Sequence, residues 1–469
     1  MEKTYQRLKG LKLTAGLSGL RSGIWLFAAF LALFVRPAQA ITIISDEETE
    51  RLLYKTAAPF YKTAGIPLRR SGLFIVQDNS LNAFVGDGNN LFVNTGTIMA
   101  ADNSNELAGV IAHETGHIAG GHILRGKLQA EELQQIGLAS LILASAAAVT
   151  SGRADAAMAI ALGGQSSMLT GFTSFRTDQE RSADEAAVKY LSETGQSPAG
   201  MLNFMKKIQT GNRLSGIEET PYFRTHPVTR ERISFLEQAV RNSKASSSGD
   251  DESFKRVKAK LTGFLSTPEE TYRKYPCTDT SPAARYARSI ADFKALRMQS
   301  ALKGINSLIK EEPQNPYFRE LKAQMYMETG KSNLAKREYA KALELLPNSA
   351  LFQINWAQAA LESSPSPAEL QKIINLLNKA VIRYPSPFAW MLLSRAYDAQ
   401  GERAYSDYAA AEYSFGIGAI ETARQQALRA QKAPQISRQL RLKTDDLLKR
   451  VKAILKENPS QQYWDWKNI

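Results

Sequence analysis

The sequence predicts an α+β domain, mostly helical with a small sheet, followed by an all-α domain of helical repeats. Two observations predict the first domain. Short apolar segments alternate with turn-forming residues, which is typical of strands and a hairpin, at 73–76, 83–85 and 91–93 with a turn at 87–90. From Ser104 to about Val240 the apolar residues recur at helical spacing. The third observation, a recurring proline-containing pattern, predicts the second domain.

That pattern is a repeat of helical hairpins. Pro313 and Pro347 end similar segments 34 residues apart, which is the tetratricopeptide (TPR) period. Pro385 follows 38 residues later, and the inserted Ser/Pro-rich residues 363–367 explain the longer spacing. A generic helical bundle is the alternative. The boundaries that we predict are 1–40 for a signal peptide, 41–241 for the first domain, 242–279 for a linker and 280–469 for a TPR-like domain.

The first forty residues have the pattern of a secretory signal. A basic segment precedes an apolar run from Ile24 to Val35, and Ala38 and Ala40 form an A-x-A cleavage pattern. An uncleaved N-terminal anchor is the alternative. No later stretch reaches the roughly 18 apolar residues of a membrane-spanning helix. Cys277 is the one cysteine, so no internal disulfide forms, and export with a lone cysteine favours a bacterial periplasm.

The charge argues against nucleic acid as a partner. The net charge is +13, and residues 1–40 contribute +5, which leaves 13 − 5 = +8 for the mature chain. Its basic residues are spread out and mixed with acids, whereas a nucleic-acid reader has a clustered basic face. Weak attraction to an anionic membrane surface is more plausible.

The chemistry is concentrated in His113-Glu114-Thr115-Gly116-His117. The segment is predicted to be helical, starting near Asn103-Ser104, and histidines four residues apart leave a helix on one face, where both imidazoles can bind one metal ion. Glu114 is placed to take a proton from metal-bound water and later to give it to the leaving amine. The chain has only four histidines, two of them here. A chance match on a surface helix is the alternative.

A carboxylate further along the chain completes the set. Glu180 and Asp184 share a face of another predicted helix, and zinc hydrolases of this kind use two histidines and one carboxylate. Glu180 is therefore the candidate third ligand, and Asp184 suits a hydrogen bond to a ligand imidazole. An ordinary charged helix face is the alternative.

Together these motifs resemble the HtpX/BepA-type zinc metalloproteases, a gluzincin family. The resemblance covers about 46–240 and includes four further segments: Asn82-Ala83-Phe84, Thr95-Gly96, Glu106-Leu107-Ala108 and Thr225-His226-Pro227 with Arg232-Ile233. The signal peptide and the TPR array make the chain similar to the periplasmic β-barrel assembly-enhancing branch. This resemblance implies a gluzincin-type fold with one Zn²⁺ per chain, bound by His113, His117 and Glu180, and Glu114 as catalytic base.

Three other side chains have less certain roles. Pro227 places His226 in an extended loop, from which its imidazole can reach the fourth zinc position and act as a switch, and the resemblance implies the same. A hydrogen bond within the loop or a substrate contact is the alternative for His226. Arg232 is a candidate oxyanion stabiliser. His122 lies five residues beyond His117. If the helix continues that far, its side chain points to a different side of the helix, and we expect it to make a structural hydrogen bond.

We therefore expect an exported zinc endopeptidase acting in the quality control of outer-membrane or envelope proteins. Its expected partners are misfolded or stalled outer-membrane proteins and, through the TPR array, their assembly machinery. Residues 136–162 contain two apolar runs, 136–149 and 156–162, separated by a turn at 151–153, and either form a core hairpin or contact the membrane surface. The strand at 91–94 is expected to form one wall of the cleft and to pair with an extended substrate. The alternatives are a TPR-based chaperone or scaffold with secondary proteolysis, and a catalytically dead relative.

Overall fold

The fold is described from a computed structural model of the chain. The structure describes residues 42–129, 131, 134–135, 139–140, 154–215, 226–245, 251–434 and 436–457. The predicted signal peptide, and residues 136–138 and 141–153 of the apolar segment, lie outside the described residues.

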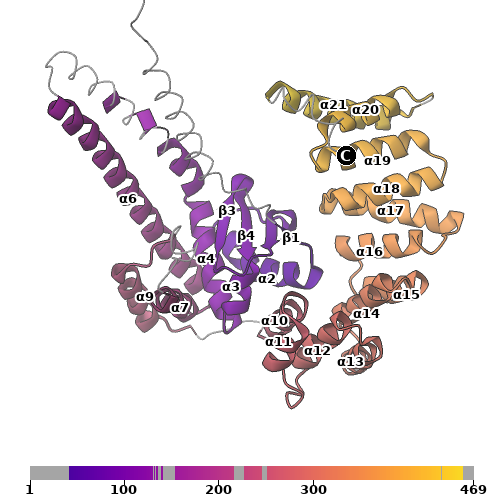
Figure 1. Cartoon of the computed structure of the whole chain (residues 1–469), viewed down its shortest axis with the longest axis horizontal. Helices are drawn as coiled ribbons and strands as arrows, with labels where there is room; N and C mark the ends of the chain where they lie inside the picture. Colours follow the sequence, from indigo (N-terminus) through magenta and orange to yellow (C-terminus); the bar gives the residue numbers. More distant parts are fainter. Residues whose placement is uncertain are drawn as a thin grey trace, which may run out of the picture. The chain divides into compact units, whose positions relative to one another are not determined.

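A small mixed sheet forms one part of the N-terminal half (Figure 1). Its strands are β1 (Ile43–Ile44), β2 (Leu73–Val76), β3 (Ala83–Gly86) and β4 (Asn90–Asn94), in the order β1-β2-β4-β3. β3 and β4 form the predicted antiparallel hairpin, in which Ala83 pairs with Val93. The turn between them contains Gly88 and Asn89, both at positive φ.

The expected pairing of the 91–94 strand with a substrate is wrong. β4 is paired on both sides, in parallel with β2 and antiparallel with β3. Its backbone groups are therefore already hydrogen-bonded within the sheet and cannot pair with a substrate strand. β3 is the edge strand at that end of the sheet, so it is the strand with a free side.

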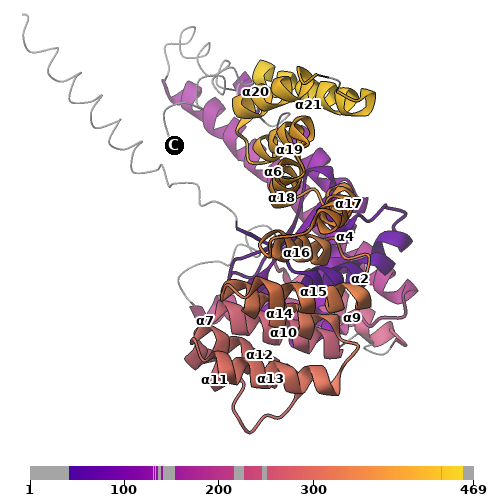
Figure 2. The same cartoon turned by 90° about the vertical axis from the view of Figure 1, so that its right-hand side faces the viewer.

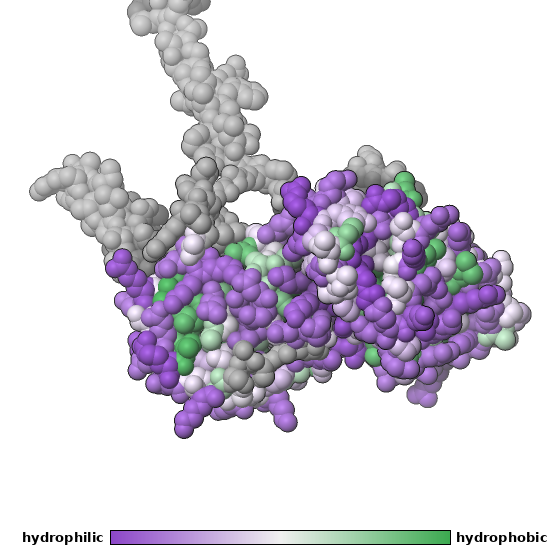
Figure 3. Space-filling model, turned by 90° about the horizontal axis from the view of Figure 1, so that it is seen from below, coloured by the Kyte–Doolittle hydropathy of each residue, from purple (hydrophilic) through white to green (hydrophobic). Residues whose placement is uncertain are grey.

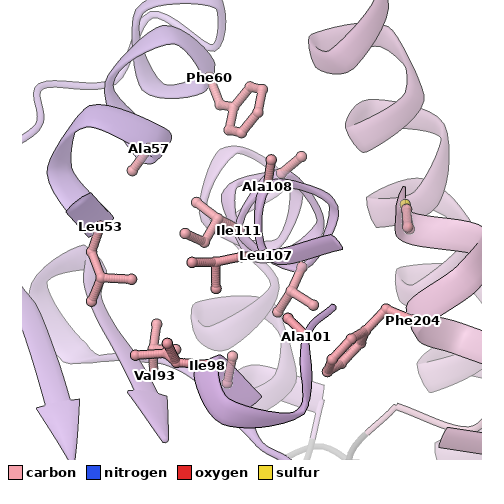
Figure 4. Packing of buried hydrophobic residues seen from close by; sticks show 14 of the residues in the cluster. Leu53, Ala57, Phe60, Val93, Ile98, Ala101, Leu107, Ala108, Ile111 and Phe204 are labelled. Atoms are coloured by element: carbon pink, nitrogen blue, oxygen red, sulfur yellow. The ribbon is translucent and has the colours of Figure 1, made fainter. Parts of the chain in front are cut away.

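Helices enclose the sheet and carry most of the core. They are α2 (Glu47–Thr63), α3 (Thr95–Ala100), α4 (Ser104–Ala119), α6 (Ala154–Glu193), α7 (Ala199–Ser215) and α9 (Arg230–Asn242). α4 starts where the sequence predicts, because the Asn103 side chain accepts a hydrogen bond from the backbone N–H of Glu106. Leu107 and Ile111 of α4 pack among side chains of α2, β4, α3 and α7 (Figure 4). α4 is thus buried, which gives its polar side chains fixed positions.

The C-terminal half consists of helices that pack in sequence order (Figures 1 and 2). Their bounds are α10 (Asp251–Leu265), α11 (Pro268–Lys274), α12 (Pro282–Lys294), α13 (Met298–Glu311), α14 (Pro316–Glu328), α15 (Ser332–Leu345), α16 (Ala350–Leu361), α17 (Pro367–Arg383), α18 (Pro387–Ala399), α19 (Arg403–Gly416), α20 (Ile420–Gln431) and α21 (Arg438–Glu457). α13, α15 and α17 each end two residues before the repeated prolines, as the period predicts. The predicted fold class, an α+β domain followed by TPR-like helices, is confirmed.

The predicted linker at 242–279 differs from what the structure has at 251–274. Those residues form α10 and α11, and Phe254, Val257 and Leu261 of α10 are buried in the same apolar cluster as α4. The Ser/Gly-rich composition of 242–252 predicted a linker, but the apolar residues that follow it recur at helical spacing. α10 therefore belongs to the core of the N-terminal half.

A charged junction joins α2 to the C-terminal helices. Ser349 donates a hydrogen bond to Glu47 (2.7 Å), and the Tyr384 hydroxyl donates one to Glu50 (3.1 Å). Lys260 of α10 is buried and forms ion pairs with Asp46 and with Glu320 of α14. These contacts lie between segments more than 200 residues apart in sequence, except for Lys260 with Glu320.

The visible surface in Figure 3 is mostly hydrophilic, with apolar residues in small separate groups. Within the part of the chain that the structure describes, no helix combines the length and the apolar character needed to cross a membrane.

Candidate metal centre

The side chains of the two histidines of the HETGH motif point toward one common position. α4 is helical throughout the motif, and His113 and His117 lie one turn apart with both rings buried. Their Nε2 atoms are 3.1 Å apart. Two buried imidazole nitrogens this close together can bind one metal ion, as the spacing of the two histidines predicts.

Glu180 and His226 join this pair from two other segments. The carboxylate oxygens of Glu180, on α6, lie 3.4 Å from Nε2 of His113 and 3.3 Å from Nε2 of His117. His226 lies in the loop before α9, and its Nδ1 is 3.0 Å from Glu180 and 3.4 Å from Nε2 of His113. The structure therefore brings together all four residues that the sequence suggested as ligands.

The arrangement fits a metal ion. One ligand atom from each of His113, His117, Glu180 and His226 lies within 4.8 Å of the others, and all four residues are buried. A tetrahedral ion with bonds of about 2.0–2.1 Å needs ligand atoms about 3.3 Å apart, since that is the edge of the tetrahedron. The separations given above span 3.0–3.4 Å. The four side chains can thus surround one small cation without moving apart.

Electrostatics favour the metal-binding forms of Glu180, His117 and His226, whereas they favour the protonated form of His113. Burial alone would raise the pKa of Glu180, but His226 and hydrogen bonds with His113 and His117 bring it well below its usual range. Burial lowers the pKa of His117 and of His226, so both imidazoles favour the neutral state in which a nitrogen lone pair is free. Burial also opposes protonation of His113, but Asp184 and Glu180 outweigh it and raise its pKa to about 9. A bound cation would have to displace that proton.

Asp184 and Arg232 form a buried pair behind the cluster. Oδ1 of Asp184 lies 2.9 Å from Nδ1 of His113, which is an ion-pair distance rather than a well-aligned hydrogen bond. Arg232 donates from Nε and Nη2 to the two Asp184 oxygens, at 2.6 and 2.9 Å. Its Nη1 donates to the backbone carbonyl of Pro227 at 2.8 Å and lies 2.8 Å from Glu180. The guanidinium thus contacts the candidate ligand Glu180 and Asp184, the residue that faces His113.

Glu114 lies on the cleft side of the cluster. Its carboxylate is buried, and Oε1 is 3.6 Å from Nε2 of His226. Burial raises the pKa of Glu114 to about 7. Glu114 and His117 line a cleft of about 180 Å³ together with Phe84 and Val85 of the edge strand β3. β3, rather than β4, therefore forms the strand wall of the cleft.

The hydrogen bond expected for His122 is present, and its partner is His117. The sequence did not predict this partner, because α4 ends at Ala119 and the chain turns before His122. A second feature that the sequence did not predict is the close approach of α4 and α6 at Gly116, where a Cβ would lie 2.8 Å from the carbonyl oxygen of Ala183. A glycine inside HExxH was the signal for this approach, because glycine permits close backbone contact.

Comparison with known proteins agrees with this site. Residues 46–240 match the model of peptidase family M48. The β-barrel assembly-enhancing protease of Yersinia pestis is 25% identical over 342 residues, which are 70% of this chain and 68% of the relative. An HtpX protease homologue of Streptococcus thermophilus is 34% identical over 139 residues, 25% of this chain and 46% of the relative.

Among solved structures, the crystal structure of MamA aligns with a TM-score of 0.30 and 17% identity, covering 40% of this chain and 97% of that one. The family model and the curated relatives support the resemblance seen in the motifs: residues 46–240 match peptidase family M48, so the chain carries a metallopeptidase domain, and it is similar to the β-barrel assembly-enhancing proteases.

Proposed function

We propose that the chain is an exported zinc endopeptidase of the bacterial periplasm that hydrolyses peptide bonds in outer-membrane or envelope proteins. The single observation that carries the zinc assignment is the buried group of three imidazoles and one carboxylate whose ligand atoms all lie within 4.8 Å of one another. One Zn²⁺ per chain follows, since the four residues form one group. The N-terminal signal pattern supports export, and the name of the Yersinia relative supports outer-membrane barrel proteins as substrates.

The residues have distinct roles in this proposal. His113, His117 and Glu180 hold the metal, which when bound polarises the scissile carbonyl and lowers the pKa of water. Glu114 accepts a proton from the attacking water and passes it to the leaving amine. The buried position of Glu114 supports this role, because burial brings its pKa to about 7, near the pH at which a general base works best.

His226 is the proposed fourth ligand and switch. Its Nδ1 lies on the Glu180 side, and its Nε2 lies 3.6 Å from Glu114, so the ring occupies the space between a ligand and the base. Substrate and water need that space. With His226 in place the enzyme is latent, and movement of the loop that carries it opens the site.

For Asp184 and Arg232 we propose positioning roles. Asp184 faces the second ring nitrogen of His113, which is where a partner fixes the orientation of a ligand imidazole. The directions of the Arg232 guanidinium toward Asp184 and Glu180 favour holding these two carboxylates in place over contact with an oxyanion. The oxyanion role suggested by the sequence therefore has less support.

The C-terminal array is the proposed recruiter of protein partners, such as stalled outer-membrane proteins or their assembly machinery. A groove of about 740 Å³ in the array is lined by aromatic and amide side chains, including Trp390, Tyr397, Asn375 and Gln400. This groove also favours a second candidate function, a TPR-based chaperone or scaffold with secondary proteolysis. We keep the apolar segment 136–162 as a proposed peripheral membrane contact.

Glu114→Gln separates the two candidate functions. The variant should retain about one zinc per chain yet hydrolyse a casein substrate about 10²- to 10⁴-fold more slowly, the usual contribution of a positioned acid-base group. Glu185→Gln, on the exposed side of α6, is the matched control and should behave as wild type. If Glu114→Gln still complemented a deletion strain, scaffolding would be the main function, and unchanged turnover would refute the assignment of the base.

His226→Ala tests latency. The variant should keep its metal on the remaining three ligands and digest casein or itself faster than wild type, whereas the exposed Glu231→Ala nearby should change neither property. Unchanged metal content with lower activity would make His226 a substrate-contacting or structural residue, and the switch would have to be abandoned.

A further inference from the structure

His117 is held on both sides of its ring. Its Nε2 faces Glu180 and His113, as described above. Its Nδ1 lies 2.9 Å from Nδ1 of His122, and the two rings meet edge to face with centroids 4.8 Å apart. His122 is 6% exposed, so the contact is shielded from water. The second nitrogen of this proposed ligand thus has a protein partner of its own.

The tautomers of the two histidines determine which of them donates the hydrogen bond. A histidine that binds a metal through Nε2 carries its single proton on Nδ1. Nδ1–H of His117 then donates to His122, which must present a lone pair on its own Nδ1 and carry its proton on Nε2.

The position of His122 is fixed from two sides. The chain turns after α4 through Gly120 and Gly121, the latter at positive φ. A Cβ on Gly120 would overlap the His122 ring, so the ring fits only against glycine. On the other side, the Gln179 side chain donates to the backbone carbonyl of His122 at 3.1 Å. Gln179 is the residue before Glu180, so α6 anchors a ligand and the neighbour of another ligand together.

The two proposed histidine ligands therefore have different partners. His113 faces the carboxylate of Asp184, which is in turn bound by Arg232. His117 faces a neutral imidazole. Partners of ligand imidazoles fix their tautomer and ring orientation. We propose that His122 is the positioning residue of His117: it accepts the Nδ1–H bond and holds Nε2 toward the metal position. This inference rests on the proposed zinc function.

The experiment compares His122→Ala with His122→Asn in the full-length protein. Alanine removes the acceptor, and zinc should bind about 10- to 100-fold more weakly in chelator competition, the usual cost of losing such a partner. The side-chain oxygen of asparagine lies where Nδ1 of histidine lies, so His122→Asn should recover affinity to within about threefold of wild type if acceptance of this bond is what matters. A merely structural role would not give this pattern of rescue.

A second measurement needs no variant. In ¹⁵N-labelled, zinc-loaded wild type, which has four histidines, NMR should show His117 protonated on Nδ1 and His122 on Nε2. Unchanged zinc affinity in His122→Ala, equal weakness of the Asn and Ala variants, or a protonated Nδ1 on His122 would each overturn the proposal. If wild type itself bound no zinc, the proposed function would fail and this inference with it. Tight binding by wild type and by His122→Ala alike would overturn this inference alone.

Discussion

Gly116→Ala should disturb the metal site by pushing two helices apart. A Cβ at Gly116 would lie 2.8 Å from the carbonyl oxygen of Ala183 and 3.0 Å from its Cα, and ordinary contact begins at 3.4 Å. The obstacle is backbone, which cannot rotate away. α6 must therefore retreat from α4 by about 3.4 − 2.8 = 0.6 Å, and overpacking of this kind typically costs about 1–3 kcal/mol of stability.

The displacement of α6 would affect the metal site because Glu180 lies one turn before Ala183 on the same helix. Its oxygens would move from about 3.3 Å to about 3.9 Å from the His117 nitrogen if α6 moved as a rigid body. Metal sites tolerate deviations of about 0.2 Å in bond length. We therefore expect zinc affinity to fall about 10- to 100-fold, comparable with the loss of a partner that orients a ligand.

The assay is chelator competition for zinc, with circular dichroism to confirm that the variant is folded. Gly126→Ala is the matched control, because Gly126 is helical and a Cβ there meets no atom within 4 Å. It should leave zinc affinity unchanged and stabilise its helix by up to about 1 kcal/mol. Wild-type zinc affinity in a folded Gly116→Ala protein would show that the two helices can separate without moving Glu180, and the reasoning would be refuted.

Two further predictions concern the junction between α2 and the C-terminal helices. Lys260→Met leaves Asp46 and Glu320 without their buried cation and should lower the free energy of unfolding by about 3–5 kcal/mol in urea titration, whereas the exposed Lys255→Met should change it by less than about 0.5 kcal/mol. Equal effects of the two substitutions would contradict this. Burial raises the pKa of Glu50 to about 8, against an ordinary 4.5, so the folded state holds this proton more tightly and loses stability as pH rises between these values. Glu50→Gln should remove that loss, so its melting temperature should rise relative to wild type from pH 5 to pH 9, and parallel pH profiles would disprove the assignment.

Much of the protein follows from local sequence patterns. The 3.6-residue period places His113 and His117 on one face of a helix whatever surrounds it. The hairpin at β3 and β4 follows from apolar segments around a turn, and the helical array follows from a repeat that recurs at the tetratricopeptide period. These features depend on residues close together in the chain, which is why sequence alone predicts them. Glu180 and Asp184 could be proposed because their residue types and spacing suit the chemistry.

Contacts between distant segments were decided only by the tertiary structure. Which strand lies at the sheet edge depends on the order β1-β2-β4-β3. β4 is an interior strand because β2 pairs with it in parallel, although β3 lies between them in the sequence. α10 belongs to the N-terminal core because its apolar face packs against α2 and α3, which its composition alone does not predict. The directions of Arg232 and His122 depend on where α9, α6 and the turn after α4 meet. Spacing along one element constrains its own side chains, whereas packing between elements determines which of them meet.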